Sequence, residues 1–306
     1  MNNNNHFEVI IVGGSYSGLA AAMALGRALR KVMIIDSGKA CNRQTPYSHN
    51  FLTQDGKTPG EISATGKEQA LMYNSVSFFS DVATQGVKTQ NGFEIKTASG
   101  GKFTARKLIF ASGIGDILYD IPGFSACWGI SVLHCPYCHG YEVRNQQTGV
   151  IGNGEYGFEL SALISNWTND LTLYTNGKST ITSEQKSHLE EHNISIEEAE
   201  IKQLVHQNGY LQYMLFKNDR KVSINVLYAR SPFVQHCAIP EIFGCEITAE
   251  GYIQTDASLK TSVHGIFACG DNTTRLRTIA NAVSMGATAG MMVNKELIEE
   301  SFYSIK

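Results

Sequence analysis

The sequence predicts an α/β fold of two domains, and two observations lead to this expectation. The chain has 306 residues, which is enough for about two domains of ~150 residues each. Twice along the chain, a short apolar segment is followed by a glycine-rich turn and a helix of small residues, as in a βαβ unit. The 42% hydrophobic and 17% charged fractions indicate a globular chain rather than a disordered one.

The first of these units opens the chain. Its turn has Gly13 and Gly18, but Ser15 stands where a middle glycine belongs. Asp36 follows at about 20 residues, the spacing at which a carboxylate binds a ribose hydroxyl. The alternative is that Asp36 only caps the next turn. The unit predicts strands over 7–12 and 31–35, with a helix over 19–30 between them.

The second unit lies in the middle of the chain. Gly152, Gly154 and Gly157 match the G-x-G-x-x-G fingerprint in full. The flanking segments predict strands over 149–151 and 170–174 and a helix over 158–167. Two such units predict two Rossmann-like dinucleotide-binding domains, because each unit can bind the phosphates of one nucleotide at its helix N-terminus.

A third element follows near the C-terminus. An apolar strand over 261–271 ends in Gly270-Asp271, and a helix of small residues follows over 279–297. With the earlier segment 108–113, this resembles the two-domain flavoprotein disulfide reductases. The resemblance implies an FAD-binding domain of residues 1–115 and 236–306, into which residues 116–235 are inserted.

The sharpest local signal is His134-Cys135-Pro136-Tyr137-Cys138-His139. Two cysteines at this spacing can close a small, reducible ring. Pro136 suits the first position of a helix, which places Cys135 at the N-cap. The helix N-terminus and the two histidines favour the thiolate form of the cysteines.

The motif precedes the second fingerprint, as the redox-active pair does in low-molecular-weight thioredoxin reductases, which this chain resembles over nearly its whole length. The resemblance implies a homodimer, with Cys138 against the flavin and Cys135 facing the substrate. His139 replaces the usual Asp acid/base and can do the same proton work. Cys-x-x-Cys-His-Gly-Tyr-Glu is more similar to a neighbouring branch, which includes the dithiol oxidases of gliotoxin and holomycin.

Other interpretations of the cysteines stay open at this stage. C-x-x-C-H is also a c-type haem attachment signature, and two inert thiols or a zinc site are further alternatives. No second C-x-x-C is present to complete a zinc site, so no metal is predicted. We expect the remaining cysteines to be buried small residues: Cys41, Cys127, Cys237, Cys245 and Cys269.

The resemblance also implies which residues hold FAD. Arg43 and His49, in the polar segment 42–52, are candidates by position only, and a solvated loop is the alternative. The other implied residues are Gly13, Ser15, Tyr16, Ser17, Gly18, Asp36, Ser37, Ala111, Gly113, Gly270, Asp271, Thr278, Ile279 and Ala280.

The nicotinamide nucleotide, NADPH or NADH, has a poorer candidate site. After the strand that ends at Tyr174 there is neither an Arg for NADPH nor an acidic residue for NADH. Lys178 is the one nearby cation, and it is a weak substitute for a bidentate Arg. The fingerprint residues Gly152, Gly154 and Gly157, with Lys178 as the nearby cation, therefore predict weak binding of either nucleotide.

The overall charge limits the partners. A formal net charge of −3 predicts no binding of nucleic acid or of an anionic membrane. The first residues lack the pattern of a signal peptide, and seven cysteines, an odd number, do not suit a disulfide framework. We therefore expect a cytoplasmic protein.

Together these observations predict an FAD-dependent dithiol/disulfide oxidoreductase, acting on a small-molecule or protein substrate. One alternative is an oxygen-dependent dithiol oxidase that forms a substrate disulfide and peroxide. An alternative of another class is a flavin redox carrier or sensor without catalytic activity.

Overall fold

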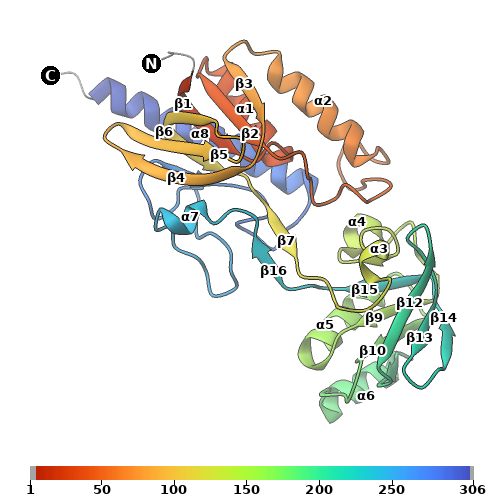
Figure 1. Ribbon diagram of the computed structural model, residues 1–306. Coiled ribbons are helices and arrows are strands. Elements are labelled where there is room, and N and C mark those ends of the chain that lie inside the picture. Colours follow the sequence, from red (N-terminus) through yellow and green to blue (C-terminus); the bar gives the residue numbers. More distant parts are fainter. Residues whose placement is uncertain (1–4, 304–306) are drawn as a thin grey trace.

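The computed structural model describes residues 5–303, and Figure 1 shows two domains side by side. In the first domain, β1, β2, β3, β6 and β17 form a parallel sheet in the order β3-β2-β1-β6-β17, and the antiparallel strands β5 and β4 extend it beside β6. The strands are β1 (His6–Val12), β2 (Val32–Asp36), β3 (Val76–Ser80), β4 (Ala83–Thr89), β5 (Gly92–Thr97), β6 (Lys102–Phe110) and β17 (Ile266–Ala268).

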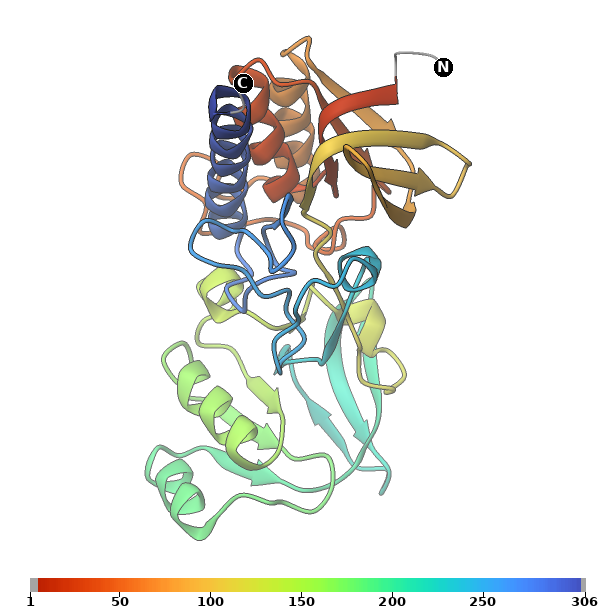
Figure 2. The ribbon, with the colours of Figure 1, turned by 90° about the vertical axis from the view of Figure 1, so that its left-hand side faces the viewer.

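Two helices from opposite ends of the chain cover one face of this sheet. Helix α1 (Tyr16–Arg27) packs against the long C-terminal helix α8 (Ile279–Tyr303), as Figure 2 shows. A Cβ on Gly286 would lie 2.0 Å from the Ser17 carbonyl oxygen, so only glycine permits this close approach. The packing brings the N-termini of both helices together. The domain's other helices are α2 (Pro59–Leu71) and the short α7 (Ile239–Ile242).

The second domain has a five-stranded parallel sheet in the order β11-β10-β9-β15-β8, next to the antiparallel sheet β12-β13-β14. Its strands are β8 (Val132–Leu133), β9 (Thr148–Ile151), β10 (Leu171–Tyr174), β11 (Ser195–Glu197), β12 (Ile201–Gln207), β13 (Tyr210–Phe216), β14 (Lys221–Ser223) and β15 (Val226–Ala229). Its helices are α3 (Phe124–Cys127), α4 (Pro136–His139), α5 (Gly154–Ile164) and α6 (Ser183–Glu191).

Two antiparallel strands carry the chain between the domains. Strand β7 (Ile114–Asp116) leads into the second domain, and β16 (Phe233–Gln235) pairs with it on the way back (Figure 1). The predicted α/β fold, with one Rossmann-like domain inserted into another, is confirmed. The boundaries 1–115, 116–235 and 236–306 stay a prediction.

Element boundaries differ from the sequence-based expectation at the glycine turns. Helix α1 begins at Tyr16 and α5 at Gly154, inside the turns rather than after them, because the tight turn itself forms the first helical residues. The strand expected over 261–271 is only Ile266–Ala268, since Gly265 before it has a φ of +80°.

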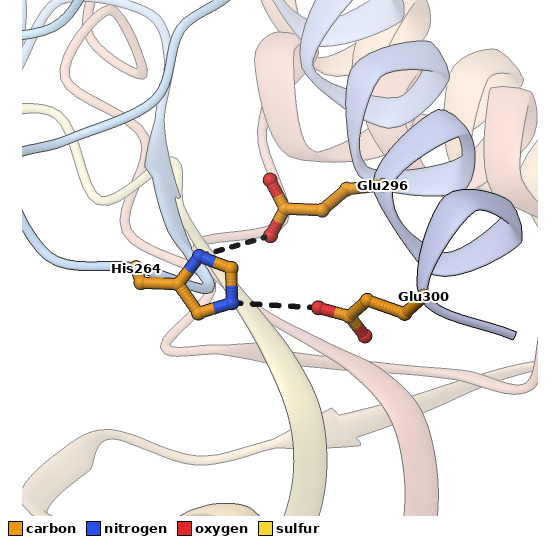
Figure 3. Close-up of side chains that lie close together, drawn as sticks. All are labelled: His264, Glu296 and Glu300. Atoms are coloured by element: carbon orange, nitrogen blue, oxygen red, sulfur yellow. Dashed lines mark ion pairs between the residues drawn. The ribbon is translucent and has the colours of Figure 1, made fainter. Parts of the chain in front are cut away.

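An ion-pair network fixes α8 to the sheet. The Nζ atom of the buried Lys107, on β6, lies 2.5 Å from Glu296 Oε1 and also binds Glu300. Figure 3 shows His264 beside the same carboxylates, with one ring nitrogen 3.8 Å from Glu296 and the other 3.4 Å from Glu300. The two ring nitrogens face different carboxylates, and an ammonium already binds both, so the arrangement is that of ion pairs rather than of a metal site.

Candidate functional site

Two adjoining cavities lie at the ends of the parallel strands and reach toward the redox motif. The first has a volume of about 340 Å³ and is lined by the turn after β1, the end of β2 and the segment after β6. The second, of about 100 Å³, lies between the N-terminus of α8 and helix α4. Tyr16, Cys41, Asp271 and Ala282 line both, so the two form one elongated site.

The turn after β1 requires its glycines. Gly13 has a φ of +105°, and a Cβ there would lie 2.2 Å from the Ala111 carbonyl oxygen. A Cβ on Gly18 would lie 1.9 Å from the Gly13 carbonyl oxygen. Asp36 accepts hydrogen bonds of 2.9 Å from the amides of Gly14 and Gly38, so it caps the turn while it lines the first cavity. Capping of the turn by Asp36 is thus compatible with a hydrogen bond from its carboxylate to a ribose hydroxyl.

The residues present in the cavities fit FAD. Ser15 is the N-cap of α1, and its side chain makes no capping hydrogen bond within the described chain, so the helix N-terminus remains open to an anionic group. Among residues 5–303, three buried polar atoms of the cavity walls have no hydrogen-bond partner, as expected where a polar ligand binds. These are Asn42 Oδ1, Ser112 Oγ and Arg277 Nε.

The redox motif forms a disulfide at the inner end of this site. Cys135 and Cys138 are bonded, with Cα atoms 5.3 Å apart. Cys135 is the N-cap of α4, and Pro136 begins the helix. Cys138 lines the second cavity, whereas Cys135 does not. The two sulfur atoms are therefore inequivalent, with Cys138 toward the cavity.

Two histidines face each other in the wall of the second cavity. The rings of His49 and His139 meet edge-on, with centroids 6.4 Å apart. Burial, together with the charge of His49, lowers the pKa of His139 to about 4. His49 Nδ1 lies 3.6 Å from carboxylate oxygens of both Asp55 and Glu142. His49 thus links His139 in the cavity wall to two carboxylates.

Arg277, which was not among the predicted site residues, lies in the same wall. Arg277 makes a bidentate ion pair with Asp116, with N–O distances of 2.7 and 2.9 Å, and its Nε lies 3.7 Å from Asp271. Asp116 belongs to β7, so the pair ties the N-terminal side of α8 to a connecting strand. The signal in the sequence was the position of Arg277, directly before the implied FAD-binding residues Thr278, Ile279 and Ala280.

The cavities bring together most of the predicted cofactor residues. Ser37, Gly113, Thr278 and Ile279 line one cavity or the other, with the residues named above. Gly18 and Gly270 lie behind the wall; a Cβ on Gly270 would lie 2.6 Å from Ser17 Oγ. Two predicted residues do not join the site: Ala280 is exposed, and Arg43 is exposed and donates to the Ala40 carbonyl.

One cysteine departs from the expected burial. Cys127, Cys237, Cys245 and Cys269 are buried, as predicted. The prediction was wrong for Cys41, which is exposed because it lines both cavities. Enclosure by the cavity walls raises the pKa of its thiol to about 11, and the Asp271 carboxylate adds to this effect. The thiol is therefore protonated near neutral pH.

The second fingerprint has a contact within the chain at its helix N-terminus. Asn153 is the N-cap of α5, and its Oδ1 accepts hydrogen bonds from the amides of Gly154, at 2.9 Å, and Thr180, at 2.8 Å. The side chain thus occupies the amide at the start of the helix, where a phosphate is expected to bind. Gln185 also donates to Glu155 in the first turn of α5, at 2.6 Å.

The remaining fingerprint residues lie around this contact. A Cβ on Gly152 would lie 3.0 Å from Gly157 Cα, so these two glycines allow the turn to pack closely. The exposed Lys178 contributes its carbonyl oxygen, which accepts from Asn153 Nδ2. Neither of the two cavities is lined by any of these residues.

Comparison with known proteins places this geometry in context. The sequence profile of the pyridine nucleotide-disulphide oxidoreductases matches residues 7–286. The chain is 30% identical to the thioredoxin reductase tcpT of Claviceps purpurea, over 98% of this chain and 97% of that protein.

Two solved structures are similar to this fold over nearly the whole chain. The fold is similar to that of HlmI, with a TM-score of 0.93 and 29% identity over 99% of this chain and 96% of HlmI. It is also similar to the putative thioredoxin reductase TrxB of Bacillus anthracis, with a TM-score of 0.92 and 28% identity, covering 97% of this chain and all (100%) of that one.

Proposed function

The chain belongs to the pyridine nucleotide-disulphide oxidoreductase family and is a thioredoxin reductase-like oxidoreductase that acts on sulfur groups, and we propose that FAD and the Cys135–Cys138 disulfide exchange electrons in it. The observation that carries this proposal is the position of Cys138. It lines the inner end of the elongated site, whose other end has the open helix N-terminus and Asp36.

Each residue of the elongated site has a distinct role in this proposal. The N-terminus of α1 holds the pyrophosphate, and Asp36 and Asp271 accept hydrogen bonds from cofactor hydroxyls. FAD, when bound, supplies a two-electron acceptor or donor. Cys135, which does not line the cavity, is the sulfur that a substrate thiolate attacks. Cys138 is the inner thiol, and His139 moves protons at the sulfur atoms.

The test begins with the purified protein. We expect one non-covalently bound FAD per chain, released on denaturation and identified by chromatography. Anaerobic dithiothreitol should bleach this flavin in the wild type, but not in Cys138→Ser, because the electron pair then has no disulfide to pass through. Release of FMN or haem, or of no cofactor after growth with excess riboflavin, would refute the proposal.

One observation favours the oxidase as the second candidate function. The contact of Asn153 with Gly154 and Thr180 occupies an amide at the start of α5 where a nucleotide phosphate would bind, and this supports substrate thiols as the source of electrons. Oxygen would then be reduced to peroxide. Oxygen uptake and peroxide formation on addition of a dithiol, without nicotinamide nucleotide, would support this direction. Turnover that requires NADPH would support the reductase.

The setting of the reaction is also a proposal. The substrate is a small-molecule or protein dithiol or disulfide, and the resemblance to thioredoxin reductases supports a homodimer in the cytoplasm. No helix among residues 5–303 is long and apolar enough to cross a membrane. A flavin carrier without catalysis remains the alternative of another class. Bound flavin with negligible turnover for every donor and acceptor would favour it.

A further inference from the structure

His49 lies where the two domains meet at the redox site. It belongs to the segment between β2 and α2, and its ring lines the second cavity with Cys138 and His139. Its Nδ1 is 3.6 Å from Asp55 Oδ2 in the first domain and 3.6 Å from Glu142 Oε1 in the second. The two carboxylates therefore face one ring nitrogen from opposite sides of the domain boundary.

The local backbone holds this arrangement in place. The amide of Ser48 donates to the Lys57 carbonyl at 2.8 Å, which closes the segment into a loop. Asp55 accepts a 2.7 Å hydrogen bond from the amide of Asn50, and this orients its other oxygen toward His49. The side chains of His49, Glu142 and Asp55 are 20%, 37% and 66% exposed, so exposure rises from the cavity wall outward.

Disulfide exchange needs a proton path at this point. When a substrate thiolate attacks Cys135, a new S–S bond forms, the Cys135–Cys138 bond breaks, and its electron pair stays on Cys138 as a thiolate. The substrate's second thiol must then lose a proton before it attacks the mixed disulfide and releases Cys135. Two protons thus move from substrate sulfur to the two cysteines, with no net change.

We propose that His49, oriented by Asp55 and Glu142, is the proton-relay residue that stores and returns these protons through His139. This inference rests on the proposed function. His139 is next to Cys138, but its low pKa means that it holds a proton only briefly near neutral pH. His49 instead has two carboxylate oxygens 3.6 Å from its Nδ1, and these orient its ring beside His139. The other titratable groups of this cavity wall are Tyr16, Cys41, His134, Asp271 and Arg277.

The test compares His49→Gln with His188→Gln. His188 on α6 has the same type of pair, with Nδ1 3.6 Å from Glu191, but it lies outside both cavities. The rate of disulfide opening by excess dithiothreitol is measured anaerobically from pH 5.5 to 9, by acid quench, alkylation and mass spectrometry. We expect His49→Gln to lose about 10²-fold and to lose the histidine break in the pH profile, because a positioned acid/base contributes at least that much. His188→Gln should match the wild type.

The carboxylates provide a second, milder test. Glu142→Gln and Asp55→Asn should each lower the rate of disulfide opening, by less than His49→Gln does, because each removes one of the two carboxylates that orient the His49 ring. Imidazole in the buffer should partly restore the rate of His49→Gly. An unchanged rate and pH profile in His49→Gln, with unchanged rates in both carboxylate variants, would overturn the inference. A wild type that dithiothreitol does not open at all would refute the proposed function itself.

Discussion

The side chains of Asn153 and Thr180 are hydrogen bonded to each other, with 3.1 Å between Asn153 Oδ1 and Thr180 Oγ1. Asn153 belongs to the fingerprint turn after β9, and Thr180 to the segment after β10. In such folds a dinucleotide binds in the crevice outside the carboxyl ends of the strands, with its pyrophosphate at the N-terminus of the helix that follows the fingerprint turn. The same Asn153 oxygen also accepts a hydrogen bond from the Gly154 amide. This amide would otherwise be free to bind a phosphate.

We therefore predict weak use of both nicotinamide nucleotides. The NADPH/NADH preference should fall well short of the several-hundred-fold that two charge-assisted hydrogen bonds of about 1.5–3 kcal/mol each would give. Stopped-flow reduction with each nucleotide, then mixing with air-saturated buffer, measures the preference and the reoxidation by oxygen. Fast NADPH reduction at micromolar levels, with NADH almost inert, would contradict this. Lys178→Ala would then test the remaining cation.

Opening the crevice should restore some affinity. Asn153→Gly removes the side chain that occupies the Gly154 amide, so we expect tighter NADPH binding by isothermal titration calorimetry. Asn166→Gly, an exposed asparagine just beyond the other end of α5, is the matched control and should leave binding unchanged. If Asn153→Gly binds NADPH no better than the wild type, the acidic Glu155 or the missing Arg is the larger obstacle.

The two redox cysteines should differ in one measurable property. Cys135→Ser and Cys138→Ser are each expected to abolish dithiol/disulfide turnover with flavin still bound, because exchange needs an attacking and a resolving sulfur. Cys135→Ser should retain a flavin–thiolate charge-transfer band, since Cys138 lines the cavity. If absorbance spectra show the band in Cys138→Ser and not in Cys135→Ser, Cys135 is the inner thiol and Cys138 the outer one. Normal turnover in both would make the motif structural.

Replacement of His139 tests its assigned proton transfer. His139→Asn should slow turnover by ~10²–10⁴-fold at every pH from 5.5 to 9, because His139, with a pKa of about 4, is neutral over this whole range and the group next to Cys138 that accepts the proton is lost. A loss below about tenfold would contradict acid/base work by His139 and leave it the role of tuning the thiolate at the start of α4. Steady-state rates across pH 5.5 to 9, normalised to flavin content, provide the measurement.

The sequence predicted the elements whose signal is local. Glycine spacing located both turns, because only glycine fits where Gly13 approaches Ala111, and the C-x-x-C spacing located the disulfide. Contacts between distant segments left no such signal. The pairing of Arg277 with Asp116 depends on a strand 161 residues away. The hydrogen bonds of Asn153 to Gly154 and Thr180 were not predicted either, because the glycine spacing of the fingerprint does not show which side chain caps the helix.

Burial of two histidines predicts how stability depends on pH. Burial lowers the pKa of His134 and of His139 from 6.5 to about 4, and Arg277 and His49, respectively, add to the shift. The unfolded chain therefore binds more protons than the folded one between these values. Stability should fall as the pH drops from about 6.5 to 4. Thermal unfolding of His134→Gln should be less sensitive over this window, and an unchanged slope would contradict the assignment.

The network at the far end of α8 yields the last prediction. The side chains of Lys107 and Glu296 are only 3% and 8% exposed, so each needs the other's charge. Lys107→Met leaves Glu296 with only the more exposed Lys260, at 2.7 Å, and His264, at 3.8 Å, and should destabilise the protein by about 3–5 kcal/mol in urea unfolding. Glu246→Gln, at an exposed carboxylate, is the control.

Because Lys107 occupies the position between the carboxylates, neither a chelator nor added zinc should change the unfolding temperature of the wild type. Stabilisation by zinc that is lost in His264→Gln would instead show that a metal displaces the ammonium.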